Sequence, residues 1–135
     1  MIDRDKQKAL LAAALNVRSQ AYAPYSKFTV GAAVLSKDGS IVSGINMENS
    51  SYGLSVCAER NTLAAAVAQG KRDFEAMAVV SKGGVAPCGA CRQVIHDICG
   101  DIEIILADEK GAIRKITSIQ ALLPDAFGDA DLKKG

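Results

Sequence analysis

Three cysteines and one glutamate form the part of this sequence best suited to chemistry. Cys57 lies two residues before Glu59, and Cys88 and Cys91 follow later in the run Pro-Cys-Gly-Ala-Cys. Three thiolates leave the fourth position of a tetrahedral zinc ion open for water, as catalytic zinc sites do, whereas structural sites fill it with a fourth residue. The spacing therefore predicts a catalytic site that holds one Zn²⁺ per chain through Cys57, Cys88 and Cys91.

A structural zinc site is the alternative, with His96 or Cys99 as the fourth ligand. His96 follows Cys91 by five residues, about 500° of helical rotation, so its ring should point away from the ligand face. Cys99 falls near the end of the same predicted helix and is expected to be a small buried side chain. Four cysteines could also form two disulfides, but nothing here indicates an oxidising compartment, so metal binding is favoured.

Length and charge limit the classes of function. The 135 residues fit one domain, 1–135, with a single core. The formal net charge is +1 with 23% charged residues, and no long run of like charge indicates a nucleic-acid or membrane-surface partner. A small neutral ligand is favoured. Apolar stretches are too short to span a bilayer, and a soluble cytoplasmic protein is expected.

The elements that must position the thiols follow from hydrophobic periodicity and turn residues. Helices are predicted over residues 5–22, 57–69, 89–98 and 118–123, and strands over 28–35, 41–45, 76–81, 102–107 and 112–116. This order predicts a three-layer α/β domain with a five-stranded mixed sheet. The last two strands should be antiparallel, because parallel neighbours need a crossover of about a dozen residues.

Two of these helices should begin at the thiols, Cys57 opening one and Cys88 the other, and their positive ends favour thiolates. Three thiolates outweigh the two charges of Zn²⁺ and would weaken it as a Lewis acid. Arg60 lies three residues after Cys57, on the same helical face, where it can hydrogen-bond sulfur and withdraw charge. Gln93 is a second candidate donor. An exposed helix arginine is the alternative for Arg60.

Three segments carry a family resemblance: residues 46–49 (Asn-Met-Glu-Asn), 57–60 (Cys-Ala-Glu-Arg) and 87–93 (Pro-Cys-Gly-Ala-Cys-Arg-Gln). A ligand two residues before Glu, followed by Pro-Cys-x-x-Cys, is the known signature of zinc deaminases. The chain resembles the small homotetrameric cytidine deaminases from Tyr25 to Phe127. The resemblance implies deamination of cytidine and deoxycytidine to uridine and deoxyuridine in pyrimidine salvage, by a homotetramer with shared sites. It leaves the preference between the two substrates open.

The resemblance also implies roles for individual residues. Glu59 would carry protons from the attacking water to ring N3 and the leaving amine. The Ala58 amide and Pro87 carbonyl would contact the pyrimidine. The remaining substrate contacts would be Asn46 and Glu48 on the ribose and Phe28 and Phe127 beside the pyrimidine, with Phe127 coming from a neighbouring subunit. Ordinary core packing is the alternative for both phenylalanines.

Three other functions remain as alternatives. A related deaminase of an aminopyrimidine nucleoside antibiotic such as blasticidin S would share the zinc site, although ribose contacts by Asn46 and Glu48 favour cytidine. A zinc-stabilised interaction domain would need a fourth protein ligand. A polynucleotide deaminase would need a basic groove, which the near-neutral charge disfavours.

Overall fold

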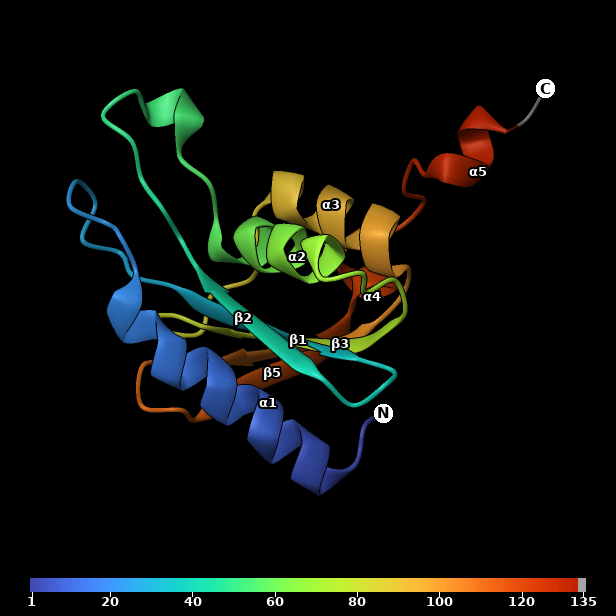
Figure 1. The fold of residues 1–135 in the computed structure, drawn as a ribbon, viewed down its shortest axis with the longest axis horizontal. Helices are drawn as coiled ribbons and strands as arrows, with labels where there is room; N and C mark the ends of the chain where they lie inside the picture. Colours follow the sequence, from blue (N-terminus) through green and yellow to red (C-terminus); the bar gives the residue numbers. More distant parts are fainter. Residues whose placement is uncertain (134–135) are drawn as a thin grey trace.

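The computed structural model describes residues 1–133 as a five-stranded sheet with helices on both faces (Figure 1). The strands are β1 (Gly31–Ser36), β2 (Ile41–Ile45), β3 (Phe74–Val80), β4 (Glu103–Ala107) and β5 (Ile113–Ser118). The helices are α1 (Arg4–Val17), α2 (Ala58–Ala68), α3 (Gly89–Cys99), α4 (Ile119–Leu122) and α5 (Asp129–Leu132). The strand order is β2-β1-β3-β4-β5, with β3 and β4 parallel and the other pairs antiparallel. This confirms the predicted mixed sheet and its antiparallel last pair.

The two faces of the sheet hold separate apolar cores, because successive strand residues point to opposite sides. Along β1, Ala32 and Val34 face the core that contains Leu63 of α2 and Ile95 of α3. Ala33 and Leu35, which point to the opposite side, join the core beneath α1. Figure 1 shows the same arrangement, with α1 on one face and α2 and α3 on the other. The predicted three layers are therefore present.

A close approach between β2 and α2 sets the height of α2 above the sheet. A Cβ built on Gly44 would lie 2.9 Å from the backbone nitrogen of Thr62. The Thr62 hydroxyl is buried and donates to the Ala58 carbonyl one turn earlier at 2.7 Å. A residue larger than glycine at 44 would push α2 outward and displace its N-terminus, which carries Cys57.

The first helix and the first strand have other boundaries than predicted. The first helix ends at Val17 and continues only as a short 3₁₀ turn, Arg18–Gln20, rather than reaching residue 22. The first strand begins at Gly31 and not at Phe28. Lys27 has a φ of 62°, a left-handed bend that interrupts the extended chain.

The segment before β1 is instead held by Asn46. Its side-chain amide donates to the Phe28 carbonyl at 2.8 Å and accepts from the Val30 amide at 2.9 Å. The short helix α5 near the C-terminus was not predicted, whereas α4 begins as expected with the Ser118 hydroxyl accepting from the Ala121 amide. Within residues 1–133, no helix is both long and apolar enough to cross a bilayer.

Candidate metal and substrate site

Three free thiols meet where α2 and α3 begin. Cys57 is the N-cap residue of α2, Cys88 is the N-cap residue of α3, and Cys91 lies in the first turn of α3. The sulfur of Cys88 lies 3.9 Å from that of Cys57 and 3.6 Å from that of Cys91. All three sulfurs lie within 4.8 Å of one another, the only such group of three or more His, Cys, Asp or Glu side chains among residues 1–133.

These distances suit a tetrahedral zinc ion. Zn–S bonds of about 2.3 Å at tetrahedral angles place sulfurs about 3.8 Å apart. Cys91 is buried, Cys57 is half-buried and Cys88 is exposed, so the group opens to the surface on the Cys88 side. His96 and Cys99 lie outside the group, and His96 packs against Gly128 instead. Neither candidate for a fourth protein ligand is therefore in place.

The contacts among the thiols shift the pKa of Cys57 and that of Cys91 in opposite directions. A hydrogen bond from the Cys91 thiol, with a further one from Arg60, lowers the pKa of Cys57 to about 5. The same hydrogen bond to Cys57, together with burial, raises the pKa of Cys91 well above its ordinary value. Cys57 is therefore the thiol that loses its proton most readily. A divalent cation would displace the protons that remain on the group, since metals bind cysteine as thiolate.

Arg60 reaches the sulfurs as its spacing predicts. Its Nη2 lies 3.8 Å from the Cys57 sulfur, a weak charge-assisted contact on the same face of α2. Its Nε is buried and has no acceptor among residues 1–133. The exposed-arginine alternative does not fit, because Arg60 is partly buried against the thiols.

Glu59 lies in the first turn of α2 beside Cys57 and is only 5% exposed. Burial raises the pKa of its carboxyl, and the negative charge on Cys57 adds to this effect. It does not belong to the ligand group. A buried carboxyl with a raised pKa that is not a ligand is suited to accept and return a proton.

A surface pocket of about 320 Å³ lies at the loop before β1. It is lined by Tyr25, Ser26, Glu48, Tyr52 and Ser55. Glu48 accepts hydrogen bonds from the backbone amides of Tyr25 and Ser26 at 3.0 and 3.1 Å, and a short one from the Ser26 hydroxyl. The Ser26 hydroxyl is also the main cause of the lowered pKa of Glu48. Glu48 therefore stays ionised and shapes the pocket.

The two predicted ribose contacts thus occupy different places. Glu48 lines the pocket, whereas Asn46 is 9% exposed and binds the backbone of the segment before β1. Sequence reasoning missed Tyr25, Ser26, Tyr52 and Ser55 as pocket residues. The tyrosine rings lie 6.1 Å apart, centre to centre, across this pocket. The scarcity of aromatic residues, 4% of the chain, was the available signal in the sequence.

The predicted pyrimidine contacts lie in three places: Ala58 and Pro87 adjoin the thiols, Phe28 precedes β1, and Phe127 lies on the tail, which we define as residues 123–133 after α4. Ala58 is the first residue of α2 and is fully buried. Pro87 is buried, and its carbonyl accepts from the Arg92 Nε at 2.8 Å. Phe28 and Phe127 are 37% and 57% exposed. Ordinary core packing therefore explains neither phenylalanine.

Known proteins resemble this chain in sequence and in fold. The model of the family described as the cytidine and deoxycytidylate deaminase zinc-binding region matches residues 4–107. The chain belongs to this deaminase family. It is 50% identical over 126 residues to the cytidine deaminase of Sporosarcina psychrophila, covering 91% of this chain and 92% of that protein. The crystal structure of cytidine deaminase from Burkholderia pseudomallei is 49% identical, with a TM-score of 0.83, over 89% of this chain and 98% of that one.

A more distant relative bears on the antibiotic alternative. The blasticidin-S deaminase of Bacillus cereus is 34% identical over 109 residues, covering 73% of this chain and 76% of that protein. The cytidine deaminase of Halalkalibacterium halodurans is 48% identical over 129 residues, covering 93% and 97%. Identity is therefore higher to the cytidine deaminases of Sporosarcina psychrophila and Halalkalibacterium halodurans than to this antibiotic deaminase.

One predicted zinc-site residue of this deaminase lies elsewhere. The Gln93 side chain donates to the Phe127 carbonyl at 2.8 Å, and among residues 1–133 it forms no hydrogen bond with a sulfur. Gln93 follows Cys91 by two residues, about 200° around α3, so it leaves the helix on another side. The neighbouring Arg92, which the sequence did not single out, lies on the Pro87 carbonyl beside the thiols.

Proposed function

We propose that this chain is a zinc-dependent cytidine deaminase that hydrolyses cytidine and deoxycytidine to uridine and deoxyuridine with release of ammonia. One observation carries the proposal: three free thiols at zinc spacing, open on one side, with buried Glu59 beside them. Three protein ligands with an open side are typical of catalytic zinc. The cytidine deaminases that resemble the chain along nearly its whole length support the substrate.

Cys57, Cys88 and Cys91 would hold the zinc ion, whose chemistry is to make the attacking water more acidic. Arg60 withdraws charge from Cys57 through the 3.8 Å contact and so counters the excess negative charge of three thiolates. Gln93 cannot share this role while its amide lies on the tail. Charge tuning is therefore proposed for Arg60 alone.

Glu59 is the proton carrier of the proposed reaction. Deamination at C4 needs one proton on ring N3 and another on the leaving amine, and both can pass through one carboxyl. Burial raises the pKa of Glu59, which makes its carboxylate a stronger base toward the proton of the attacking water. Its place in the first turn of α2, next to Cys57, keeps it close to the thiol group.

The surrounding backbone and pocket would orient a neutral nucleoside. The first turn of α2 offers free amides at Ala58, and a carbonyl such as that of Pro87 keeps a second lone pair after accepting from Arg92. The pocket at the loop before β1 would receive the sugar beside Glu48. Its lining contains a carboxylate and no lysine or arginine, so a 5′-phosphate would be repelled and not clamped.

The active form is proposed to be a homotetramer with shared sites, Phe127 reaching the site of a neighbouring chain. The exposure of this ring, 57%, on a tail whose backbone is fixed supports the proposal.

Mixed oligomers of Phe127→Ala and Glu59→Ala chains should regain activity, because some sites then combine an intact Glu59 with an intact Phe127. Mixtures of Glu59→Ala with Cys88→Ser chains are the control and should stay inactive, since both lesions affect the same chain's part of the site. Equal inactivity of the two mixtures, with mixing verified by mass, would contradict sharing.

Ultraviolet absorbance of cytidine, deoxycytidine and blasticidin S tests the reaction directly. Purified zinc-loaded protein should convert both nucleosides and should lose activity with a chelator, and added zinc should restore it. Conversion of blasticidin S alone would select the antibiotic alternative, and conversion of none would refute the proposed function. A single catalytic domain over residues 1–135, a cytoplasmic location and a role in pyrimidine salvage stay predictions.

A further inference from the structure

Arg92 joins two segments that flank the site from different parts of the chain. Its Nε donates to the Pro87 carbonyl and its Nη1 donates to the Leu122 carbonyl, both at 2.8 Å. Pro87 immediately precedes the thiol Cys88, and Leu122 is the last residue of α4, from which the tail departs. One planar guanidinium thus links the loop that carries a metal ligand to the root of the tail.

The position of Arg92 on α3 explains this reach. Arg92 follows Cys88 by four residues, about 400° of rotation, so it lies above Cys88 on the same face. Long side chains on a helix lean toward its N-terminus, which brings the guanidinium back to Pro87. The Leu122 carbonyl is one of the acceptors that a helix leaves unpaired at its C-terminal end, and a side-chain donor can satisfy it.

Two further residues of α3 contact the tail at Phe127 and Gly128. Gln93 donates to the Phe127 carbonyl at 2.8 Å, and Gly128 is buried against His96, where an added Cβ would lie 2.9 Å from the ring Nε2. The backbone is therefore held at the Phe127 carbonyl and at the next residue, while the Phe127 side chain remains exposed. Figure 1 shows the tail passing from α4 beside α3 to α5, which stands away from the sheet.

We propose that Arg92 is a positioning residue that couples the tail to the metal centre, with Gln93 as a second anchor that holds only the tail. Arg92 fixes the peptide before Cys88, and so the direction of that thiol and of the Pro87 carbonyl, while it fixes the start of the segment that presents Phe127. The role of Phe127 in this inference rests on the proposed function. The two anchors make different predictions, because only Arg92 touches the metal loop.

Arg92→Lys keeps the charge but replaces a planar fork with a point donor that cannot hold both carbonyls. Chelator-driven zinc release should become at least about 10-fold faster, the usual lower bound when a group that orients a metal ligand is lost. Amide hydrogen exchange over residues 123–128 should also speed up. Gln93→Met should speed exchange in the same residues and leave zinc release as in wild type.

Arg72→Lys is the matched control. Arg72 also donates to two carbonyls through its Nη1, those of Val67 at 3.0 Å and Lys71 at 2.8 Å, but at the far end of α2 from the thiols. Its zinc release and tail exchange should equal those of wild type. None of these measurements needs turnover, so a wild-type protein without cytidine activity would refute the proposed function and leave this test intact.

The coupling is overturned if Arg92→Lys releases zinc at the wild-type rate, or if zinc release accelerates while tail exchange does not. Should that variant fail to fold, nuclear magnetic resonance of the wild-type protein decides. The Arg92 Nε proton, which points at the Pro87 carbonyl, should exchange with water more slowly than that of Arg72, whose carbonyl contacts use Nη1. Equal exchange of the two Nε protons would overturn the proposal.

Discussion

The two ends of α3 carry the same reactive residue type in different surroundings. At the N-terminal end, Cys88 and Cys91 meet Cys57, and the contact between thiols lowers the pKa of Cys57 to about 5. At the C-terminal end, Cys99 has no other thiol in its surroundings within residues 1–133, and burial alone raises its pKa to about 12. The difference comes from convergence of groups, because Cys57 of the neighbouring helix α2 meets the N-terminal end of α3 and not its C-terminal end.

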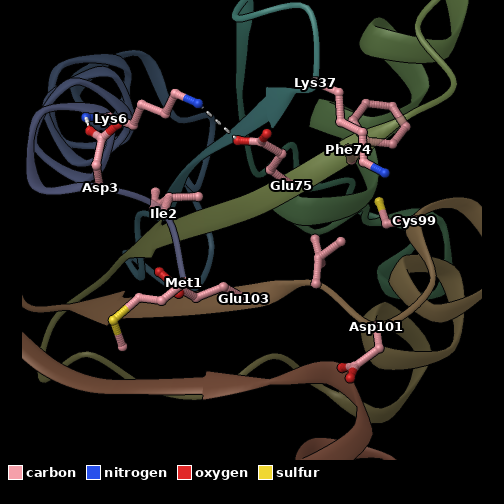
Figure 2. A pocket seen from close by; sticks show the side chains of 11 residues that line it. Met1, Ile2, Asp3, Lys6, Lys37, Phe74, Glu75, Cys99, Asp101 and Glu103 are labelled. Atoms are coloured by element: carbon pink, nitrogen blue, oxygen red, sulfur yellow. Dashed lines mark hydrogen bonds and ion pairs between the residues drawn. The ribbon is translucent and has the colours of Figure 1, made fainter.

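The larger cavity lies at the end of α3 where no thiols converge. The cavity at the Cys99 end, about 640 Å³, is larger than the pocket of about 320 Å³ near the proposed site. Figure 2 shows its lining: Glu75 is paired with Lys6 at 3.5 Å, and Asp101 and Glu103 come from separate positions along the wall. No three of its acidic and thiol groups converge, within the part of the chain that the structure describes. Convergent chemistry therefore locates the proposed site better than volume does.

The largest expected effect comes from removing proton transfer at the thiol end. Glu59→Gln should keep the fold, the zinc and much of the nucleoside affinity, but lose turnover by about 10²–10⁴-fold or more, because an amide cannot carry a proton at neutral pH. Zinc content, melting temperature and cytidine turnover are measured on one preparation. A variant with intact zinc and a tenth of wild-type turnover would remove Glu59 from the mechanism. At the other end of α3, Glu103→Gln is the control and should leave turnover unchanged.

The next test replaces one cysteine at each end of α3 with serine, in separate variants. Cys88→Ser should lose most of the zinc, because it removes one of the three sulfurs that meet within 4.8 Å, whereas Cys99→Ser should keep close to one zinc per chain. Metal analysis after dialysis against a weak chelator measures both. Equal loss of zinc in the two variants would break the comparison between the ends and the ligand assignment with it.

A smaller effect is expected from the cation beside the thiols. Arg60→Gln should slow turnover by about 10–100-fold, the range for groups that tune a metal through its ligands, with little change in KM. The physical reason is that charge left on the thiolates makes the bound ion a poorer Lewis acid. Separate measurement of kcat and KM checks this, with zinc content as the control. An unchanged kcat would show that the charge excess is offset elsewhere.

The sequence predicted the thiol group well because short spacings fix short distances. Cys88 and Cys91 lie within one helical turn, and Cys57 caps the neighbouring helix, so the elements alone bring them together. The segment from Phe28 to Val30 was predicted as strand because its apolar pattern is local, whereas the Asn46 amide that holds it comes from a different strand end.

Gln93 shows the other limit of sequence reasoning. Its residue type suited the thiolates, but its acceptor is a carbonyl on the tail, and no periodicity in the sequence places residues 123–128 beside α3. Arg92 was missed for the same reason, since both of its partners are backbone atoms of other segments. The spacing of side chains in the sequence predicts contacts along one helix. A contact with the backbone of a loop can be predicted only when the course of that loop in space is known.

The smallest effect is expected from Cys99→Ala, which tests the inert end of α3. Cys99 packs against the core, so near neutral pH the substitution should lower stability by about 1 kcal/mol, a typical cost for one side chain.

The pKa of Cys99 in the folded protein, about 12, lies above the ordinary value of 9.0, so the folded state holds this proton more tightly than the unfolded chain does. The unfolded chain loses the proton first as pH rises above 9.0, and this contribution to stability is lost between pH 9.0 and about 12. Urea unfolding of wild type and Cys99→Ala near pH 8 and near pH 10.5 should therefore show the wild-type advantage shrinking at the higher pH, while other alkaline titrations affect both proteins alike. A constant difference between the two proteins would mean that Cys99 is not desolvated by its packing, and the contrast between the two ends of α3 would then need another cause.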